Sequence, residues 1–304
     1  MNKEEIYRKL LDLTGDPERV MLDVPMSEHT TFRTGGPADI MIEPSGTVEL
    51  AEVILFLNRS GAEYYILGNG SNVLVRDGGY RGVIIRIGNR MSSISITGTT
   101  LTAQSGALLS TAAREACEHS LEGMEFASGI PGSVGGAVFM NAGAYGGEMK
   151  QIIVSVTAVT KEGEIVRYSA RELELGYRHS LFESNEAVIT EAVLELRYGD
   201  KDRIVERMKD LAERRRSKQP LNLPSAGSTF KRPPGYFAGQ LIDNAQMRGV
   251  SLGGAQVSPK HAGFIVNNGD ATSQDILDLI TLVQMRVKET SGVDLEREVR
   301  VIGE

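Results

Sequence analysis

The sequence predicts an α+β protein, and three observations support this class. Apolar runs of strand length outnumber the segments in which apolar residues recur at helical spacing. The runs do not alternate regularly with helices, as a βαβ fold would require. The composition, with 41% hydrophobic and 24% charged residues, is that of a globular protein and excludes a disordered, collagen-like or coiled-coil chain. At 304 residues, the chain is long enough for two domains.

In the first part of the chain, apolar side chains at helical spacing predict helices at residues 2–13, 48–58 and 108–117. Short apolar runs predict strands at 39–42, 64–67, 73–75 and 83–87, a hairpin over 92–104 around Gly98, and further strands at 152–159, 164–168 and 187–196.

A second domain is expected after this part. Residues 201–216 form an amphipathic helix with a basic end, and a stretch rich in proline, glycine and serine follows it. Thr272 and Asp275 resemble a capping box in front of an apolar helical stripe, and residues 299–302 read as a strand. We therefore divide the chain into domains of residues 1–200 and 201–304.

Charge and cysteine content limit the function classes. A net charge of -7 disfavours broad contact with nucleic acid or anionic membranes, so an anionic ligand must be held by local cations. Cys117 is the single cysteine, and the four histidines show no metal-binding spacing, so we expect no disulfide and no metal. The charged N-terminal region carries no apolar stretch of signal-peptide or membrane-span length, which predicts a cytoplasmic protein.

The 34 glycines are roughly 11% of the chain, against a usual ~7%, and they concentrate at residues 68–72 and 129–147. Glycine loops expose backbone amides that can bind a pyrophosphate, although tight turns between strands are the ordinary explanation. Val73 stands where a Rossmann fingerprint needs its third glycine, and no P-loop occurs. The pattern is a strand, a glycine-rich turn and a second strand.

Seven ordered blocks carry a resemblance to a known family. They are HTTFRTGGPAD (29–39), LGNGSNVLV (67–75), SGIPGSVGGAVFMNAGAYG (128–146), YRHS (177–180), PSAGSTFKRP (224–233), GGAQVSPKHAGFIVN (253–267) and LEREVR (295–300). Together they resemble the UDP-N-acetylenolpyruvoylglucosamine reductases over nearly the whole chain. Only residues 181–186 separate YRHS from the next strand, so the chain resembles the short-loop subtype (type II), and a substrate-contacting tyrosine of the other subtype has no counterpart here.

The resemblance implies a two-lobed FAD-binding region of the vanillyl-alcohol-oxidase (PCMH) type, followed by a smaller α+β substrate-binding C-terminal domain. It implies noncovalent FAD, with NADPH as the hydride donor and a UDP-sugar as the substrate, in peptidoglycan precursor synthesis. No nucleic acid, membrane or obligate protein partner is implied. The cofactor-binding residues it points to are Gly68, Asn69, Gly70, Ser71, Asn72, Gly129, Gly132, Ser133, Gly135 and Gly136.

The implied reaction reduces an enolpyruvyl ether, which accepts hydride poorly unless its carboxylate is polarised. By resemblance, Arg178 pairs with that carboxylate, Glu298 acts beside it as a protonated acid, and Ser228 delivers the proton to the carbon. Arg297 replaces the proline that is usual in the family's closing motif, next to Glu298. Outside their motifs, these residues would be an ordinary surface arginine, turn serine and edge-strand glutamate.

The diphosphate and carboxylate of the substrate need cations. The expected substrate-binding residues are Tyr177, Arg215, Lys218, Lys231, Arg232 and Arg248, although a solvated basic helix end would explain part of this set. His179 and His261 are expected to be hydrogen-bonded structural residues.

Two alternatives remain open. One is an alcohol or sugar oxidase or dehydrogenase of the same flavin fold. Many such enzymes tether FAD through a histidine near the first glycine cluster, and no histidine occurs between His29 and His119, which leaves only their noncovalent relatives open. The other is a catalytically silent UDP-sugar-binding regulator, which would lack the catalytic trio that this chain retains.

Overall fold

The computed structural model describes all residues from 1 to 304, and they form two compact units. The first unit comprises Met1–Leu22, Ile40–Asn69 and Gly82–Arg214, and the second comprises Asp23–Asp39, Gly70–Arg81 and Arg215–Glu304. Each unit is therefore assembled from segments that are far apart in the sequence. The functional domain boundary after residue 200 stays a prediction.

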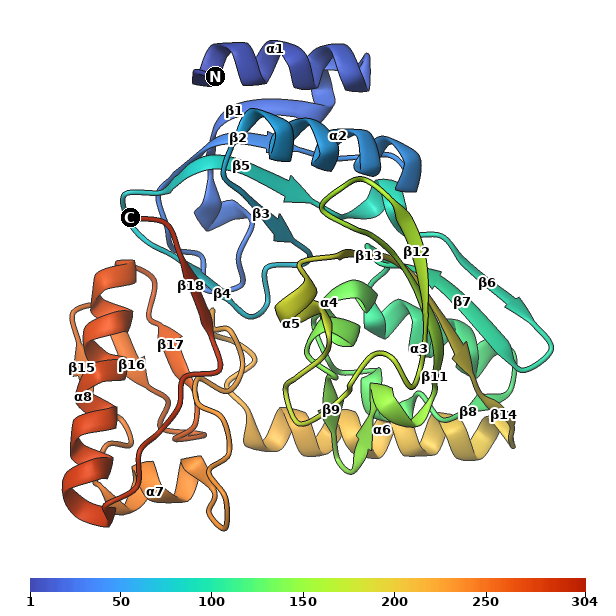
Figure 1. The fold of residues 1–304 in the computed structure, drawn as a ribbon. Helices are drawn as coiled ribbons and strands as arrows, with labels where there is room; N and C mark the ends of the chain where they lie inside the picture. Colours follow the sequence, from blue (N-terminus) through green and yellow to red (C-terminus); the bar gives the residue numbers. More distant parts are fainter. The chain divides into compact units, whose positions relative to one another are not determined.

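The first unit opens with two packed helices, α1 (Lys3–Thr14) and α2 (Thr47–Ser60). In Figure 1, α2 lies along a four-stranded sheet of order β1-β2-β5-β3. The sheet consists of β1 (Val20–Pro25), β2 (Pro37–Ile42), β5 (Tyr80–Arg86) and β3 (Tyr64–Leu67). Leu50 and Ile54 of α2 share one core with Ile40 and Ile85 of the sheet. Both helices and three of these strands were predicted, whereas β1 was not.

A five-stranded antiparallel sheet of order β12-β11-β13-β7-β6 forms the rest of the first unit's framework. Its strands are β6 (Ile94–Thr97), β7 (Thr100–Gln104), β11 (Ile153–Val159), β12 (Ile165–Ser169) and β13 (Val188–Glu195), and all five were predicted. Helices α3 (Leu109–Glu118) and α4 (Val134–Phe139) share its core, in which Leu101, Val138 and Leu194 are fully buried.

The second unit combines a small antiparallel sheet with two helices. Strands β15 (Ser251–Leu252), β16 (Ala255–Val257) and β17 (Ile265–Asn267) lie next to one another in this order. Helix α8 (Ser273–Ser291) packs on them and on α7 (Ala238–Asn244). A separate parallel pair joins β4 (Val73–Val75) to β18 (Arg300–Ile302), which places the strand after the first glycine cluster beside the strand after Glu298.

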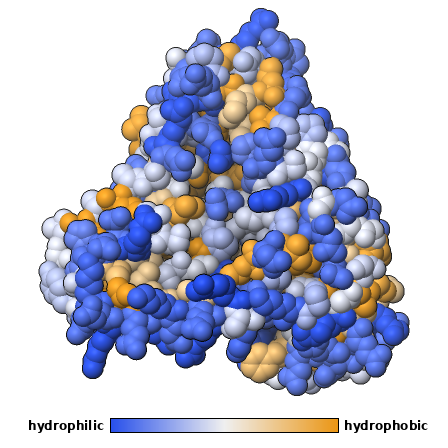
Figure 2. Space-filling view, turned by 180° about the vertical axis from the view of Figure 1, so that it is seen from behind, coloured by the Kyte–Doolittle hydropathy of each residue, from blue (hydrophilic) through white to orange (hydrophobic).

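The remaining elements are short, apart from the charged helix α6 (Lys201–Lys218). They are α5 (Phe182–Asn185), β8 (Leu121–Glu122), β9 (Gly143–Ala144), β10 (Gly147–Glu148), β14 (Arg197–Tyr198) and 3-10 turns at Pro17–Arg19, Met26–Glu28, Asn89–Met91, Glu125–Ala127 and Met149–Gln151. Hydrophilic residues cover most of the face seen in Figure 2, and hydrophobic residues appear there in separate groups. None of the helices has the length and apolar character needed to span a membrane.

Candidate active site

The two glycine clusters meet within the first unit. The Asn69 side-chain amide donates a hydrogen bond to the Pro131 carbonyl over 2.5 Å. A Cβ on Gly68 would lie 2.5 Å from the Ser133 hydroxyl oxygen, so a side chain at residue 68 would displace that hydroxyl. The residues after β3 and the residues before α4 therefore lie close together, with no side chain on Gly68 between them. Such a meeting of loops suits a bulky anionic group that backbone amides must reach.

The amides of Gly135 and Gly136 already donate hydrogen bonds within the chain. The Gly135 amide donates to the Ser105 carbonyl over 2.8 Å, and a Cβ on Gly135 would lie 2.7 Å from Ser105 Cβ. The Gly136 amide donates to the Ser133 hydroxyl, which caps α4. The buried Ser105 hydroxyl has no hydrogen-bond partner in the chain. A buried polar atom without a partner beside two converging glycine loops fits a cofactor such as FAD.

The first glycine cluster continues into the second unit, where it meets the 29–39 block. The Thr31 amide donates to the Gly70 carbonyl over 3.1 Å. Gly70 has a φ of +62°, and a Cβ there would lie 2.0 Å from the His29 carbonyl oxygen, so only glycine is accommodated. The hydroxyls of Thr31 and Thr34 are buried without a hydrogen-bond partner in the chain. They too fit a bound polar group at this loop.

Arg178 stands on a strained reverse turn of the first unit. Gly176 and His179 bond to each other through both backbone amides, over 3.1 and 3.3 Å, and the chain reverses across Tyr177 and Arg178. Arg178 has a φ of +54°, in the left-handed region that few residues with a side chain adopt. Its guanidinium carbon lies 5.1 Å from the Tyr177 ring centroid. An arginine held in such a conformation is typical of a functional position.

Asn141, which was not predicted as a site residue, holds this turn. Its side-chain amide donates to the Gly176 carbonyl over 2.9 Å and to Glu148 Oε2 over 3.1 Å, and its Oδ1 accepts from the Lys150 amide over 2.9 Å. Asn141 is 1% exposed and has a φ of +41°. The Ser180 hydroxyl adds a second link by donating to the Phe139 carbonyl over 2.7 Å. The second glycine-rich block thus supports the Arg178 turn directly.

Ser228 lies on the surface of the second unit, next to a fully buried anchor. Gly227 has a φ of +75°, which turns the chain, and Ser228 is exposed. Thr229 is 0% exposed. Its amide donates to the Gly263 carbonyl over 2.9 Å, and its hydroxyl accepts from the Ile265 amide over 3.1 Å. Thr229 was not predicted as a site residue, and a threonine after a serine in a turn gives no local signal of burial.

The backbone of Glu298 bonds both to Thr229 and to Asn72 of the first glycine cluster. Its amide donates to the Thr229 carbonyl over 2.8 Å, and its carbonyl accepts from the Asn72 side-chain amide over 3.2 Å. The Arg300 amide donates in turn to the Asn72 carbonyl over 3.1 Å. Arg297, which departs from the usual motif, forms an isolated antiparallel β-bridge with Phe230. Within the second unit, Ser228, Glu298 and the Gly70–Asn72 loop are therefore brought together.

The basic candidates occur in different settings. Lys231 pairs with Glu296 over 2.5 Å, and Arg248 makes a two-pronged contact with Asp243. The guanidinium carbon of Arg232 lies 3.9 Å from the Phe237 ring centroid, and its Nε donates to the Tyr236 carbonyl. Lys218 is exposed near the end of α6, and Arg215 lies one turn earlier on that helix. All five of these basic residues belong to the second unit, whereas Tyr177, the remaining expected substrate-binding residue, belongs to the first.

Both histidines that were predicted to be structural are hydrogen-bonded. His179 Nδ1 lies 2.7 Å from Glu183 Oε2. His261 Nδ1 accepts from the Gly263 amide over 3.1 Å. Burial lowers the pKa of His261, and the nearby cations Arg248 and Lys218 lower it further.

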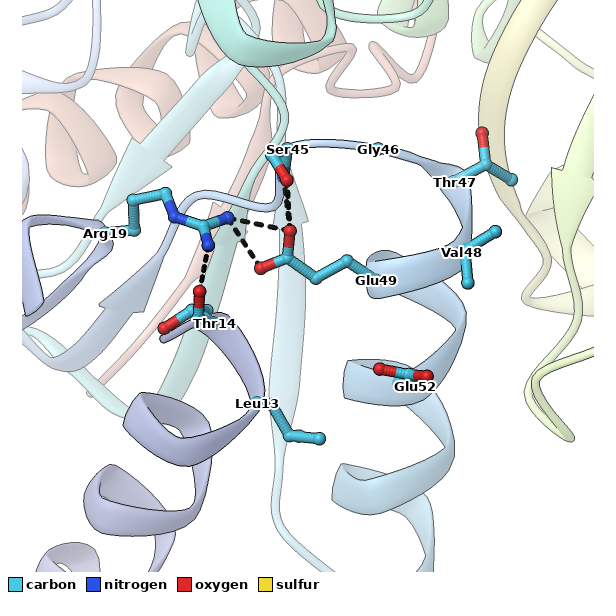
Figure 3. A pocket seen from close by; sticks show the side chains of 9 residues that line it. All are labelled: Leu13, Thr14, Arg19, Ser45, Gly46, Thr47, Val48, Glu49 and Glu52. Carbon is cyan, nitrogen blue, oxygen red and sulfur yellow. Dashed lines mark hydrogen bonds and ion pairs between the residues drawn. The ribbon is translucent and has the colours of Figure 1, made fainter. Parts of the chain in front are cut away.

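The pocket in Figure 3, about 440 Å³ in volume, lies at the start of α2 and is separate from these groups. Arg19 contacts Glu49 through both carboxylate oxygens, over 2.6 and 2.7 Å, and donates to the Thr14 carbonyl. Ser45 donates to the same carboxylate. Burial alone would raise the pKa of Glu49, but these hydrogen bonds and the Arg19 charge lower it overall. The Arg19 guanidinium bonds to Thr14 at the end of α1 and to Glu49 of α2, so the cluster ties these two helices together.

Comparisons with known proteins agree with this arrangement. Residues 38–169 match the model of an FAD binding domain, and residues 219–302 match the C-terminal domain of UDP-N-acetylenolpyruvoylglucosamine reductase. The chain is 50% identical to the UDP-N-acetylenolpyruvoylglucosamine reductase of Clostridioides difficile (strain 630) over 304 residues, covering 100% of both chains. It is 48% identical to the enzyme of that name from Alkaliphilus oremlandii, again covering 100% of both.

Solved structures support the same assignment. The UDP-N-acetylenolpyruvylglucosamine reductase of Thermus caldophilus aligns with a TM-score of 0.80 and 34% identity, covering 93% of this chain and 98% of that one. An alkyldihydroxyacetonephosphate synthase aligns with a TM-score of 0.51 and 16% identity over 65% of this chain and 41% of that one, which shows a shared fold alone. The predicted α+β flavoprotein fold is confirmed. On its motifs, its full-length similarity and its structure, the chain belongs to the UDP-N-acetylenolpyruvoylglucosamine reductase family.

Proposed function

We propose that Arg178, Glu298 and Ser228 are the catalytic residues of this chain. As a member of the family, it is an FAD- and NADPH-dependent oxidoreductase that reduces UDP-N-acetylglucosamine enolpyruvate to UDP-N-acetylmuramate for peptidoglycan synthesis. The observation that carries the proposal is the 2.8 Å hydrogen bond from the Glu298 amide to the Thr229 carbonyl. This bond supports the proposal because it holds the backbone of Glu298 against Thr229, the residue after the exposed Ser228, next to the Gly70–Asn72 loop.

Each residue is given the role that its chemistry allows. The planar guanidinium of Arg178 binds the substrate carboxylate in two-pronged fashion and draws negative charge toward it. The Glu298 carboxyl group donates a hydrogen bond where that charge develops. Ser228 gives its hydroxyl proton to the adjacent carbon, and a carbanion is basic enough to take a proton from an alcohol that is held in place.

Residues of both glycine clusters are proposed to hold FAD without a covalent link. The donors are the backbone amides of Gly68, Asn69, Gly70, Ser71, Asn72, Gly129, Gly132 and Ser133, while Gly135 permits the close approach to Ser105 and Gly136 lies at the capped start of α4. The bound flavin supplies hydride transfer from NADPH to the methylene carbon of the substrate. The buried Ser105, Thr31 and Thr34 hydroxyls are additional hydrogen-bonding groups for it.

The substrate-binding set remains Tyr177, Arg215, Lys218, Lys231, Arg232 and Arg248. Lys231 and Arg248 already hold carboxylates, so they must exchange these partners to bind a diphosphate. This proposal includes no obligate protein partner, nucleic acid or membrane, and it locates the reaction in the cytoplasm, where the precursors of peptidoglycan are made.

Ser228→Ala tests the proton-donor role by separating the two half-reactions. Reduction of FAD by NADPH delivers no proton to the substrate, so its rate should be unchanged. Reoxidation of the flavin by the enolpyruvyl substrate should slow by about 10²- to 10⁴-fold, the usual contribution of a positioned general acid. Rapid mixing with detection of flavin absorbance follows each half separately.

Ser251→Ala is the matched control, because Ser251 is an exposed serine of the same unit. Both half-reactions should keep their rates in that variant. An equal loss of both halves in Ser228→Ala, or no loss in the second, would remove Ser228 from the acid role and leave it as a turn residue.

A further inference from the structure

His261 closes a tight turn in the second unit. The buried Ser258 hydroxyl accepts from the amides of Lys260 and His261, over 3.2 and 3.3 Å. The Phe264 amide donates to the His261 carbonyl over 2.9 Å. Within this turn, the His261 side chain folds back, and its Nδ1 accepts from the Gly263 amide over 3.1 Å. The side chain thus bonds to the backbone two residues further along the chain.

The imidazole ring is fixed by its surroundings. Phe264 meets it edge to face, with 4.9 Å between ring centroids. A Cβ on Gly263 would lie 3.0 Å from His261 Cε1, so a larger residue at 263 would push the ring away from the amide. A Cβ on the neighbouring Gly239 would lie 3.7 Å from the same Cε1. The ring position and the turn geometry depend on each other.

The same turn supports the segment that bears Ser228. The Gly263 carbonyl accepts from the Thr229 amide over 2.9 Å, and the Ile265 amide donates to the Thr229 hydroxyl over 3.1 Å. Thr229 has no exposed surface, so its backbone position is set by these bonds and by the Glu298 amide. Two hydrogen bonds therefore link the imidazole to the residue next to Ser228.

This link requires an uncharged ring. An amide can only donate, so Nδ1 must carry the lone pair and the single ring proton must be on Nε2. Protonation would place a second N–H on Nδ1, facing the Gly263 amide, and would break the bond. Burial lowers the pKa of His261 below 6.5 and so favours the uncharged ring, and Arg248 and Lys218 lower it further, whereas a hydrogen bond to the backbone of His261 itself and the charge of Asp243 raise it.

We propose that His261 is a positioning residue for proton delivery: its neutral ring holds the 261–264 turn that fixes Thr229 and thereby Ser228, and protonation of the ring releases this support. The proposal rests on the role of Ser228 given above. It predicts an acid-side loss of rate confined to the half-reaction that needs the proton.

Three variants test it. His261→Asn places a side-chain oxygen where it can accept the same amide two residues on, as in an Asx turn, but cannot titrate. His261→Ala removes the acceptor. His119→Asn is the control, since His119 is exposed at the end of α3, in the first unit. FAD content and both half-reaction rates from pH 5 to 8 are measured for every protein. The pKa of His261 is measured by NMR in the unsubstituted protein and in His119→Asn, which retain this residue.

In the unsubstituted protein and in His119→Asn, substrate-driven reoxidation should fall below pH 6.5 with the pKa that NMR gives for His261, while reduction by NADPH should not show this loss. His261→Asn should keep the neutral-pH rate within about threefold and lose the acid-side fall. His261→Ala should lose about 10- to 100-fold in reoxidation at every pH, as expected when a reacting group is displaced. If His261→Ala does not fold, the pH profile of His261→Asn still decides the question.

The double variant Ser228→Ala/His261→Ala separates this inference from the catalytic assignment. If His261 acts through Ser228, the double variant should be no slower than Ser228→Ala. If the fold-losses in reoxidation rate of the two single variants multiply in the double variant, the inference is overturned. It is also overturned if His261→Asn still loses reoxidation rate at acidic pH. If instead Ser228→Ala alone leaves reoxidation unchanged, the role of Ser228 fails, whatever the histidine variants show.

Discussion

Replacing Asn141 by aspartate tests whether the second glycine-rich block holds the Arg178 turn. Aspartate has the same size and also tolerates a positive φ, so the change removes the side-chain amide donor and keeps the Oδ1 that accepts from the Lys150 amide. The buried amide makes two bonds, one to the Glu148 carboxylate and one to the Gly176 carbonyl.

The expected magnitude follows from these two bonds. A hydrogen bond to a charged group is worth about 1.5–3 kcal/mol, and one to a neutral carbonyl about 0.5–1.5 kcal/mol. Asn141→Asp should therefore lower the free energy of unfolding by about 2–4 kcal/mol at pH 7. The introduced carboxylate also faces Glu148, so the loss should shrink at acidic pH, where the new group binds a proton and can donate again.

Urea unfolding with FAD at a fixed saturating concentration measures the stability, and steady-state turnover measures the effect on the Arg178 turn. Turnover should fall because Gly176, at the base of that turn, loses its anchor. The control is Asn89→Asp, since Asn89 is exposed in the same unit and its change should stay within about 0.5 kcal/mol. A loss in Asn141→Asp no larger than this control, or one that does not depend on pH, would refute the reasoning.

Three further predictions concern the cofactor, the carboxylate-binding arginine and the clamp in Figure 3. Denaturation should release FAD into the filtrate, and flavin that stayed with the unfolded chain would favour a covalent oxidase. Arg178→Lys keeps the charge but removes the planar guanidinium, so turnover should fall by about tenfold or more while FAD content is retained. Near-normal turnover would exclude Arg178 as the group that polarises the substrate carboxylate. Glu49→Gln should lower the free energy of unfolding at pH 7 by about 1–3 kcal/mol, because it weakens the paired carboxylate around Arg19. The folded-state pKa of Glu49 lies below 4.5, so its contribution to the free energy of unfolding is present above pH 4.5 and is lost as the pH falls. The stability of Glu49→Gln should therefore depend less on acidic pH than that of the unsubstituted protein. An unchanged acid sensitivity would contradict the assignment.

Local patterns predicted the elements that form from their own residues. The apolar stripe of α8 and its capping box are confirmed, with the Asp275 amide donating to the Thr272 hydroxyl and the Thr272 amide to the Asp275 carboxylate, each over 3.0 Å. Helix α7 was not predicted, because its seven residues include Gly239 and are too few to show a helical stripe.

Pairing and burial could not be predicted in the same way. The strand, glycine turn and strand at residues 64–75 were expected, but β3 pairs with β5, and β4 pairs with β18. The local pattern is the same whichever partner a strand finds. Asn141 and Thr229 likewise have the sequence signature of turn residues, and only their distant partners make them buried anchors. The motif blocks indicated which segments matter, but not which backbone atoms connect them.

The bond from Asn72 to Glu298 joins residues that are 226 positions apart. A ribosome adding about 5–20 residues per second needs on the order of ten seconds or more to make the intervening chain. During that time β4 has no β18 beside it, and the proposed site lacks Glu298. Contacts of such long sequence separation form slowly even in the released chain. Catalytic competence should therefore emerge late during biogenesis, only after β18 has been made and has paired with β4.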